Sequence, residues 1–351
     1  MKINNPSKLL ALLATASVAA TASFAQVTSD VVGYVTFSVP DSTDAKFGIP
    51  MNSASEAHAV SSVTSGTITT TTDVSSASTT NYIQFTSGSL SGEWFQVSSS
   101  SSNTLTVADD LESLGVTASD SFEILEFWTL SNLLGTSFTA STDIFSPIAQ
   151  VILNDVDAVG INKAPTYNYA YHDGSSGFIS AGWFDSSNPF GGSADDVLLA
   201  PNSFITVRNE SGSTIDIVIA GSVPSNAINF RITADSSTSN DVLVFNPYPS
   251  DLTLSSSNLQ DVIAVSTDIF SPAEQIIVYD STDTGLNPSP RFNYAYHDGS
   301  SGFISAGWFD TSNPFGGSQD SVTIPAGGAF VVRKAAGGSD ASWNAALPYS
   351  L

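Results

Sequence analysis

The sequence contains no cysteine, and only nine of its 351 residues are lysine or arginine, against 33 aspartates and glutamates. Without a thiol the chain has no disulfide, no cysteine metal ligand and no cysteine nucleophile. A nucleic-acid interface needs clustered cations to neutralise phosphates, and nine scattered cations are too few to form one. We therefore exclude nucleic acid and anionic lipid as partners.

Long apolar runs are also missing. After residue 25 no apolar stretch approaches the roughly 18 residues that cross a membrane, so we expect no membrane span. At the N-terminus, Lys2 and Lys8 precede an apolar stretch, and Ser23 and Ala25 fit the small-residue rule for cleavage. We predict a signal peptide over residues 1–25 and a protein exported to the periplasm, the outer cell surface or the extracellular space.

The chain does contain enough apolar material for packed cores, since 41% of its residues are hydrophobic and 10% are aromatic. Short alternating segments rich in β-branched and aromatic residues, such as 215–219 and 329–333, predict β-strands. No stretch after the signal peptide sustains a helical period, although 111–116 and 129–134 each fit a single turn. The predicted fold class is therefore all-β.

Two parts of the chain are nearly identical. Residues 168–193 read NYAYHDGSSGFISAGWFDSSNPFGGS, and residues 293–318 repeat them with Thr311 in place of Ser186. The heptapeptide STDIFSP also occurs twice, at 141–147 and 266–272. The surrounding sequence has diverged, so either selection or recent local gene conversion has kept these pieces uniform. The repetition predicts two related β-sandwich or barrel-like modules in tandem.

Weaker flanking matches place module 1 at 27–224 and module 2 at 225–351. Residues 56–126 have no counterpart in module 2, and they contain strand-like segments separated by Ser-Gly turns. This pattern predicts a small β-barrel inserted in module 1. Within it, the Ser/Thr-rich stretch 61–80 is interpreted as exposed edge strands and a loop, with a glycosylated or flexible stalk as the alternative.

Several motifs recur in one order along the chain: Val31-Val32-Gly33-Tyr34-Val35, then Gly92-Glu93-Trp94-Phe95, then Asp120–Ile124 leading to Trp128-Thr129-Leu130, then a Pro…Phe…Val-Arg ending. Together with the signal peptide, this order resembles an uncharacterised Verrucomicrobia-type family of exported, signal-peptide-bearing β-repeat proteins. The resemblance covers most of the chain after residue 25. It implies an exported β-rich protein and transfers no catalytic residue.

The repeated segment opens with an aromatic stripe. Read as a strand, it places Tyr167, Tyr169 and Tyr171 on one face and Asn168, Ala170 and His172 on the other. Asp-Gly at 173–174 predicts a chain reversal, after which Phe178-Ile179 and Trp183-Phe184 supply returning strands. Adjacent Trp and Phe face opposite sides, so one ring in each module is either exposed or covered by a loop.

Such a stripe has two interpretations. It suits the core of a β-sandwich, and it also suits a carbohydrate-binding face, where sugar rings stack on aromatic side chains beside polar groups. The candidate ligand-binding residues are Tyr169, Tyr171, His172, Asp173 and Trp183, with Tyr294, Tyr296, His297, Asp298 and Trp308 as their equivalents.

The His-Asp pairs within this set do not predict catalysis, because neighbours on a strand point apart and no nucleophile or metal motif accompanies them. We interpret them as a strand-end His followed by a turn Asp. No standard nucleophile, phosphate-binding or dinucleotide motif is present, so we predict no enzyme activity. Paired carboxylates can lie anywhere in a sequence, and nothing singles out a pair.

Calcium is the one ion that the sequence suggests, and we predict no other cofactor. Asp155 and Asp157 in module 1, and Asp280 and Asp283 in module 2, lie in corresponding loops and offer oxygen ligands. The alternative interpretation is solvated turns.

These observations predict an exported, non-enzymatic structural or adhesive protein of the cell surface or envelope. The alternative is a carbohydrate-binding protein that uses the repeated aromatic segment. The expected partners are a second copy of the chain, joined by strand addition, or an extracellular polysaccharide.

Overall fold

The computed structural model describes residues 31–135, 138–279, 284–300 and 302–351. The predicted signal peptide, 1–25, lies outside these residues. The regular secondary structure of the described chain is nearly all strand, 41% against 4% helix, which confirms the all-β fold class. Its one α-helix is α2 (Leu130–Leu134), a single turn within the predicted 129–134. The described residues contain no helix long and apolar enough to cross a membrane.

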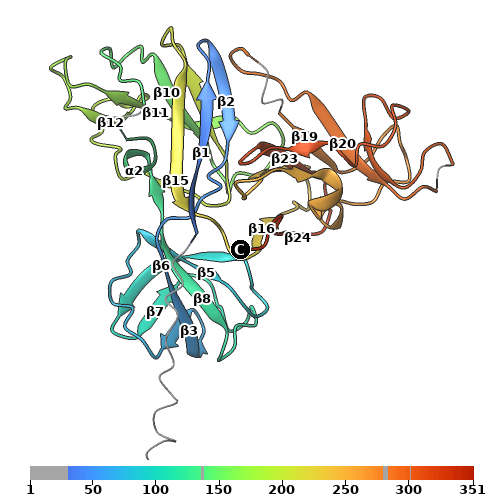
Figure 1. The fold of residues 1–351 in the computed structure, drawn as a ribbon, viewed down its shortest axis with the longest axis horizontal. Helices are drawn as coiled ribbons and strands as arrows, with labels where there is room; N and C mark the ends of the chain where they lie inside the picture. The colour runs from blue at the N-terminus through green and yellow to red at the C-terminus, as the bar shows by residue number, and fades with distance from the viewer. Residues whose placement is uncertain (1–30, 136–137, 280–283, 301) are drawn as a thin grey trace, which may run out of the picture. The chain divides into compact units, whose positions relative to one another are not determined.

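Module 1 consists of three small sheets (Figure 1). The largest has five antiparallel strands in the order β12 (Gly182–Asp185), β11 (Pro165–His172), β10 (Ala149–Asn154), β14 (Ile205–Asn209) and β2 (Thr43–Phe47). The others are a two-stranded ribbon of β1 (Val32–Val39) with β15 (Ile215–Ser222), and a short pair of β9 (Trp128–Thr129) with β13 (Leu198–Leu199).

Module 2 repeats every pairing in the same order. Its five-stranded sheet runs β21 (Gly307–Asp310), β20 (Phe292–His297), β19 (Gln275–Val278), β23 (Ala329–Lys334) and β17 (Asn240–Phe245). The ribbon is β16 (Ile228–Ile232) with β24 (Ala341–Ala345), and the short pair is β18 (Leu252–Thr253) with β22 (Thr323–Ile324). The 3-10 turns η2 (Leu254–Ser256) and η3 (Leu259–Asp261) follow β18. The repeated sequence therefore encodes a repeated fold.

Strict alternation of apolar and polar residues builds the ribbon of module 1. Every second side chain of β15 is buried, and the pairs Val35–Ile219 and Phe37–Ile217 face inward across the two strands. These side chains pack with Trp183 and Val151 of the five-stranded sheet in one hydrophobic cluster. The aliphatic ribbon thus covers one face of that sheet.

The inserted barrel lies in the chain between β2 and β9, where module 2 passes directly from β17 to β18. It is the group of strands at the bottom of Figure 1. Its strands, in barrel order, are β3 (Ser55–Thr64), β4 (Thr67–Thr70), β7 (Thr104–Val107), β6 (Trp94–Ser101), β5 (Asn81–Phe85) and β8 (Ser121–Glu126). Strands β3 and β4 each pair on both sides. The expectation of edge strands in 61–80 is therefore wrong, because closure of a barrel removes the edges.

The chain reversal after β11 also differs from the sequence prediction. It takes the whole loop 173–181, and Phe178-Ile179 lies in that loop rather than in a returning strand. Gly174 and Gly177 both adopt positive φ, 84° and 73°, so the loop turns twice. An Asp-Gly pair favours a residue with positive φ but does not fix the length of the turn. Here it begins a nine-residue loop, 173–181, instead of a tight hairpin.

The two modules hold each other by a reciprocal contact that we call the clasp. In each module the loop between the second and third strands of the five-stranded sheet in chain order, β10–β11 or β19–β20, reaches the edge strand of the other module. Asp241 N–H on β17 donates to Gly160 O at 2.9 Å, and Asp44 N–H on β2 donates to Gly285 O at 3.0 Å. Each loop therefore adds a backbone hydrogen bond to its neighbour's exposed sheet edge.

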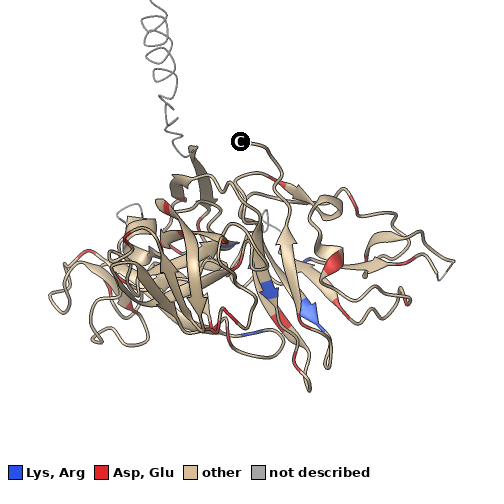
Figure 2. Cartoon of the chain, turned by 90° about the horizontal axis from the view of Figure 1, so that it is seen from below, with Lys and Arg blue, Asp and Glu red and all other residues tan. Residues whose placement is uncertain are grey.

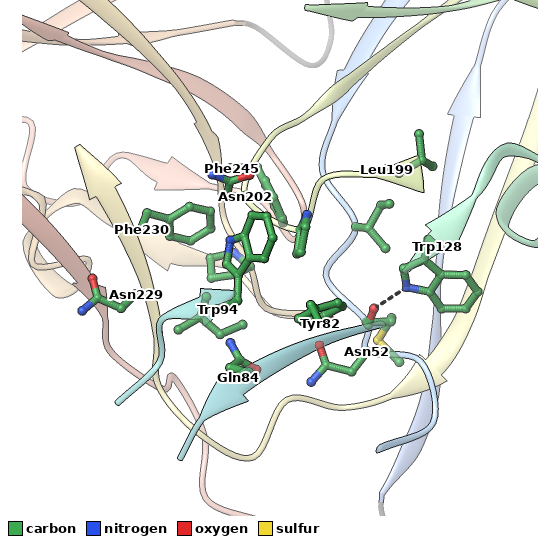
Figure 3. A pocket seen from close by; sticks show the side chains of 15 residues that line it. Asn52, Tyr82, Gln84, Trp94, Trp128, Leu199, Asn202, Asn229, Phe230 and Phe245 are labelled. Atoms are coloured by element: carbon green, nitrogen blue, oxygen red, sulfur yellow. Dashed lines mark hydrogen bonds between the residues drawn. The ribbon is translucent and has the colours of Figure 1, made fainter. Parts of the chain in front are cut away.

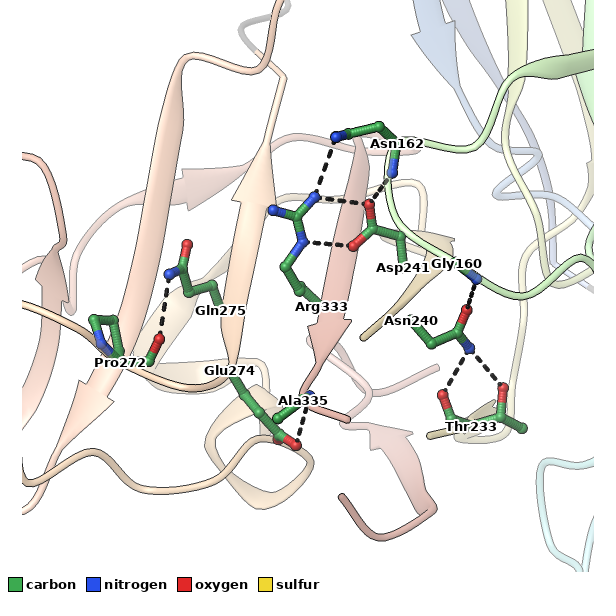
Figure 4. A network of polar contacts seen from close by, with 10 residues as sticks. All are labelled: Gly160, Asn162, Thr233, Asn240, Asp241, Pro272, Glu274, Gln275, Arg333 and Ala335. Carbon is green, nitrogen blue, oxygen red and sulfur yellow. Dashed lines mark hydrogen bonds and ion pairs between the residues drawn. The ribbon is translucent and has the colours of Figure 1, made fainter. Parts of the chain in front are cut away.

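Side chains complete the clasp in the same way on both sides. Arg333 donates to both carboxylate oxygens of Asp241 at 2.7 and 2.8 Å, and it also donates to Asn162 Oδ1 at 3.2 Å (Figure 4). Asn162 N–H returns a bond to Asp241 Oδ2 at 2.7 Å. The counterparts in the other half are Arg208, Asp44 and Asn287, bonded in the same pattern.

The loops of the clasp need an unusual backbone conformation. Asn162 and Asn287 have φ of 50° and 53°, the left-handed region that asparagine adopts more readily than most residues. This conformation aims the backbone N–H of each asparagine at the carboxylate of the other module.

Candidate functional site

The repeated segment packs the centre of each module. Trp183 on β12 is 1% exposed and Tyr169 on β11 is 8% exposed, and both belong to the main cluster of module 1. Their equivalents Trp308 and Tyr294 are buried in the cluster of module 2. These four buried rings cannot stack on a sugar, so they are core residues and not ligand-binding residues.

Tyr171 and Tyr296 are half-buried against the same cores. Each packs edge-on against the tryptophan across the strand pair, with ring centroids 5.7 Å apart for Tyr171–Trp183 and 5.5 Å apart for Tyr296–Trp308. Only part of each tyrosine reaches solvent. They contribute more to packing than to a binding surface.

The opposite face of β11 and β12 is closed by loops. Phe184 is 2% exposed and lies with Ala170 under Ile144 and Ile179, which come from the loops before β10 and after β11. Module 2 repeats this cluster with Phe309, Ala295, Ile269 and Ile304. Both faces of the repeated strand pair are thus covered. The sequence left open whether one ring of each adjacent Trp-Phe pair is exposed or covered by a loop, and Phe184 and Phe309 are covered by loops.

His172 and His297 are fully buried at the ends of β11 and β20. Gly174 N–H donates to His172 Nδ1 at 2.8 Å, and Gly299 N–H donates to His297 Nδ1 at 2.7 Å. Because Nδ1 accepts in both modules, the N–H of each ring that is free to donate is on Nε2.

Asp173 and Asp298 are exposed turn residues. Asp173 Oδ1 accepts from Ser175 N–H at 2.8 Å, and Asp298 Oδ1 accepts from Ser300 N–H at 2.7 Å. Bonds from the following serine lower the pKa of each carboxyl from its ordinary value. Asp173 Oδ1 lies 3.8 Å from His172 Nε2, beyond hydrogen-bond distance, so this aspartate does not orient the imidazole as a catalytic dyad would.

The calcium candidates divide between described and undescribed residues. Asp155 Oδ1 accepts from Asp157 N–H at 3.0 Å, which closes a local turn. Asp280 and Asp283 lie outside the described residues. Within residues 31–135, 138–279, 284–300 and 302–351, no group of three or more histidines and carboxylates is placed to hold a metal ion.

The repeated sequence also produces exposed aromatic rings that the sequence interpretation missed. Phe145 from STDIFSP and Phe190 from the SNPFGG turn are 70% and 63% exposed, with ring centroids 6.3 Å apart and an interplanar angle of 63°. Phe270 and Phe315 form the equivalent pair in module 2, 69% and 63% exposed, at 6.1 Å and 63°. We call these Phe pair 1 and Phe pair 2.

The loops that carry the Phe pairs are tightly held. Ile144, directly before Phe145, is 1% exposed, and Phe145 N–H donates to Asp143 Oδ1 at 2.8 Å. On the other loop Asp185 Oδ1 accepts from Ser187 N–H at 2.8 Å, and Gly191 N–H donates to Asn188 O at 2.9 Å. The rings are therefore presented to solvent by a fixed backbone and not by a loose loop.

Phe178 and Phe303, also in the repeated segment, add further exposed aromatic surface, at 67% and 68% exposure. The neighbouring Ile179 packs on Ile144, so the Phe178 loop lies beside the loop of Phe145. One signal in the sequence could have revealed these rings: each phenylalanine borders Ser, Pro, Asn or Gly, inside a segment that both modules repeat.

A second candidate is a cavity where barrel and modules meet, but it is small. Tyr82 and Trp94 of the barrel, Trp128 of module 1 and Phe230 of module 2 line about 30 Å³, and Trp128 Nε1 donates to Met51 O at 3.0 Å (Figure 3). That volume suits one or two water molecules. The cavity is a packing junction and too small for an organic ligand.

The sheet edges bear on self-association by strand addition. On β12, Trp183 N–H donates to Asp195 Oδ1 at 2.8 Å and Trp183 O accepts from Ala194 N–H. At the opposite edge, β2 is engaged by the clasp. These bonds occupy edge groups that an added strand would need, which counts against strand addition at those positions.

Comparison of the chain with protein-family models, with curated proteins and with solved structures found no match.

Proposed function

We propose that this is an exported, non-enzymatic adhesive protein of the cell envelope or its surroundings, which attaches through Phe pairs 1 and 2. One observation carries the proposal. The segments that are identical in the two modules present the same exposed rings in the same geometry, at 6.3 and 6.1 Å. Membership of the Verrucomicrobia-type family of exported β-repeat proteins is part of the same proposal.

The energetics favour a binding role for these rings. A phenylalanine left in water forgoes roughly 1.5–3 kcal/mol that burial would provide, so the exposed rings add little to folding. That free energy becomes available when a partner covers them. Two equal sites on one chain raise the avidity for an extended target by a factor of about 10² to 10⁴ when both engage.

The proposal is tested by retention of the purified protein on thin films in a flow cell, with an alkyl-terminated film and films of cellulose and chitin. We expect retention of the wild-type protein on the alkyl film, partial loss for Phe145→Ser/Phe190→Ser and for Phe270→Ser/Phe315→Ser, and complete loss for the fourfold variant. The matched control is Tyr34→Ser/Val218→Ser, which removes rings and methyls that are 72% and 52% exposed on the β1–β15 ribbon.

Two results would contradict the proposal: a fourfold variant retained as well as the wild-type protein, or a wild-type protein retained on none of the films. A loss for the Tyr34/Val218 control equal to that of the fourfold variant would place the adhesive surface on the ribbon instead.

A carbohydrate-binding protein is the second candidate. It is favoured by the exposed carboxylates of Asp143 and Asp173, which lie in the same loops as Phe145 and Phe178 and are suited to sugar hydroxyls. Retention on cellulose or chitin, with none on the alkyl film, would support this alternative over general adhesion.

A further inference from the structure

The few cations of this acidic chain are not evenly spread (Figure 2). Lys46, Lys163 and Arg333 line one cleft of about 430 Å³ between the modules, and Arg208 bonds to Asp44 in its wall. The described residues contain seven lysines and arginines: Lys46, Lys163, Arg208, Arg231, Arg291, Arg333 and Lys334. Most of the positive charge therefore gathers around the clasp.

Of the four cations around the clasp, two form ion pairs within the described residues and two do not. Arg333 is paired with Asp241 at 2.7 Å, and Arg208 is paired with Asp44 at 2.7 Å. Within the part of the chain that the structure describes, Lys46 and Lys163 have no ion pair of their own. Lys46 Nζ lies instead over the ring of Tyr279, 4.8 Å from its centroid. The cleft thus holds two ammonium groups that make no ion pair within the described residues.

Both ammonium groups are partly removed from water. Burial lowers the pKa of Lys46 from its ordinary value, with Asp44 acting in the opposite direction. Burial likewise lowers the pKa of Lys163, and the charges of Asp241, Asp155 and Asp157 oppose that shift. A desolvated cation in a cleft gains more from an anion than an exposed lysine does, because less solvent screens the pair.

The rest of the wall is polar and contains an aromatic ring. Asn154, Thr206 and Ser289 offer amide and hydroxyl groups, and Tyr279 provides the ring. The volume falls within the roughly 300–1,000 Å³ of small-molecule sites. Hydroxyl-binding groups, a ring and two cations in one cleft match the chemistry of a charged sugar.

We propose that the cleft between the modules binds an acidic saccharide, with a carboxylate or sulfate of the sugar held between Lys46 and Lys163. Asn154, Thr206 and Ser289 then meet the sugar hydroxyls. This site shares no residue with the Phe pairs, so it goes beyond the adhesive function and can fail or succeed independently of it.

The test is isothermal titration calorimetry of the purified protein at low salt. The probes are a galacturonate trimer and a sulfated galactose trimer, with a neutral galactose trimer as control. Acetate, inorganic sulfate and a hexaglutamate peptide test whether anionic charge alone is sufficient. We expect the protein to bind one of the acidic trimers and not to bind the neutral trimer. Binding of the galacturonate trimer would show that the site holds a carboxylate, and binding of the sulfated trimer would show that it holds a sulfate.

Single substitutions connect the binding to the cleft. Lys46→Met and Lys163→Met should each weaken binding by about 10- to 100-fold, the effect of a lost charge-assisted hydrogen bond. Arg231→Met removes the same charge outside the cleft and should leave affinity within about twofold. Lys46→Arg/Lys163→Arg keeps the charge and should retain binding. Circular dichroism and the urea midpoint of each variant separate lost binding from lost folding.

Several outcomes would overturn the inference. These are no binding of either acidic trimer, binding that Lys46→Met and Lys163→Met leave unchanged in folded protein, and equal loss in Arg231→Met. Equal affinity for hexaglutamate, acetate or sulfate would also overturn it, because the site would then recognise charge and not a sugar.

Discussion

Replacing Asp44 by alanine is expected to destabilise the protein by about 3 kcal/mol. The side chain of Asp44 is 2% exposed and accepts three hydrogen bonds, from Arg208 Nε at 2.8 Å, from Arg208 Nη2 at 2.7 Å and from Asn287 N–H at 2.8 Å. Removing one partner of a buried ion pair lowers the free energy of unfolding by about 3–5 kcal/mol, whereas a surface ion pair contributes only about 0–1 kcal/mol. Arg208 is 21% exposed and can recruit water, which places the expected cost at the lower end.

Urea denaturation followed by tryptophan fluorescence measures this cost, with the slope checked for a change in cooperativity. Asp241→Ala should behave alike, because Arg333 and Asn162 bond to Asp241 in the same pattern. Asp216→Ala, an exposed carboxylate on β15, is the control and should stay within about 0.5 kcal/mol. A cost below about 1 kcal/mol for both clasp variants would refute the reasoning, since the pairs would then act as ordinary surface ion pairs.

The effect of Asp44→Ala should also depend on pH. Burial alone would raise the pKa of Asp44, but the bonds from Arg208 and from Asn287 N–H outweigh it and lower the pKa from its ordinary value. A lowered folded-state pKa contributes stability that is present above the unfolded value of about 3.9 and is lost as the pH falls through the folded value. The difference between wild type and variant should therefore shrink below about pH 4.

Three further predictions concern core packing, the contact between the modules and a helix cap. Trp183→Ala and Trp308→Ala should each cost about 3–5 kcal/mol, because both rings are 1% exposed, and unchanged urea midpoints would contradict their placement in the cores. Gly48→Ala should lower the free energy of unfolding by about 1–3 kcal/mol, since an added Cβ would lie 1.9 Å from the ring of Phe245 in the other module. The double variant Gly48→Ala/Phe245→Leu should recover part of that loss. A Gly48→Ala variant as stable as the wild-type protein would show that the modules approach less closely. Thr129→Ala should cost about 1 kcal/mol by removing the cap of α2, measured by thermal denaturation, whereas Thr129→Ser should restore most of it.

The fold could be predicted from the sequence where local patterns decide it. Alternation in 215–219 and in 329–333 predicts strands that match β15 and β23. Repetition of 168–193 predicted two related modules. Closure of the barrel depends on β3 pairing with β8, far along the chain, so local patterns in 61–80 could not reveal that its strands have two neighbours.

The candidate site was harder to predict, because alternation tells which face a side chain takes and not how deeply it lies. Trp183 and Tyr169 were open to two interpretations for that reason, and their burial is a tertiary property. Phe145 and Phe190 come from separate loops and meet only in the folded module. The contact of Arg208 with Asp44 joins residues 164 positions apart, beyond any local pattern.

The central claim is that the Phe pairs serve binding and not folding. Its most direct test is a pair of measurements on the variant Phe145→Ser/Phe190→Ser/Phe270→Ser/Phe315→Ser: the urea midpoint and the retention on the alkyl film. Because the four rings are 63–70% exposed, we expect a midpoint equal to that of the wild-type protein within error, together with loss of retention. A lowered midpoint with retention intact would contradict the account, since the rings would then stabilise the fold and bind nothing.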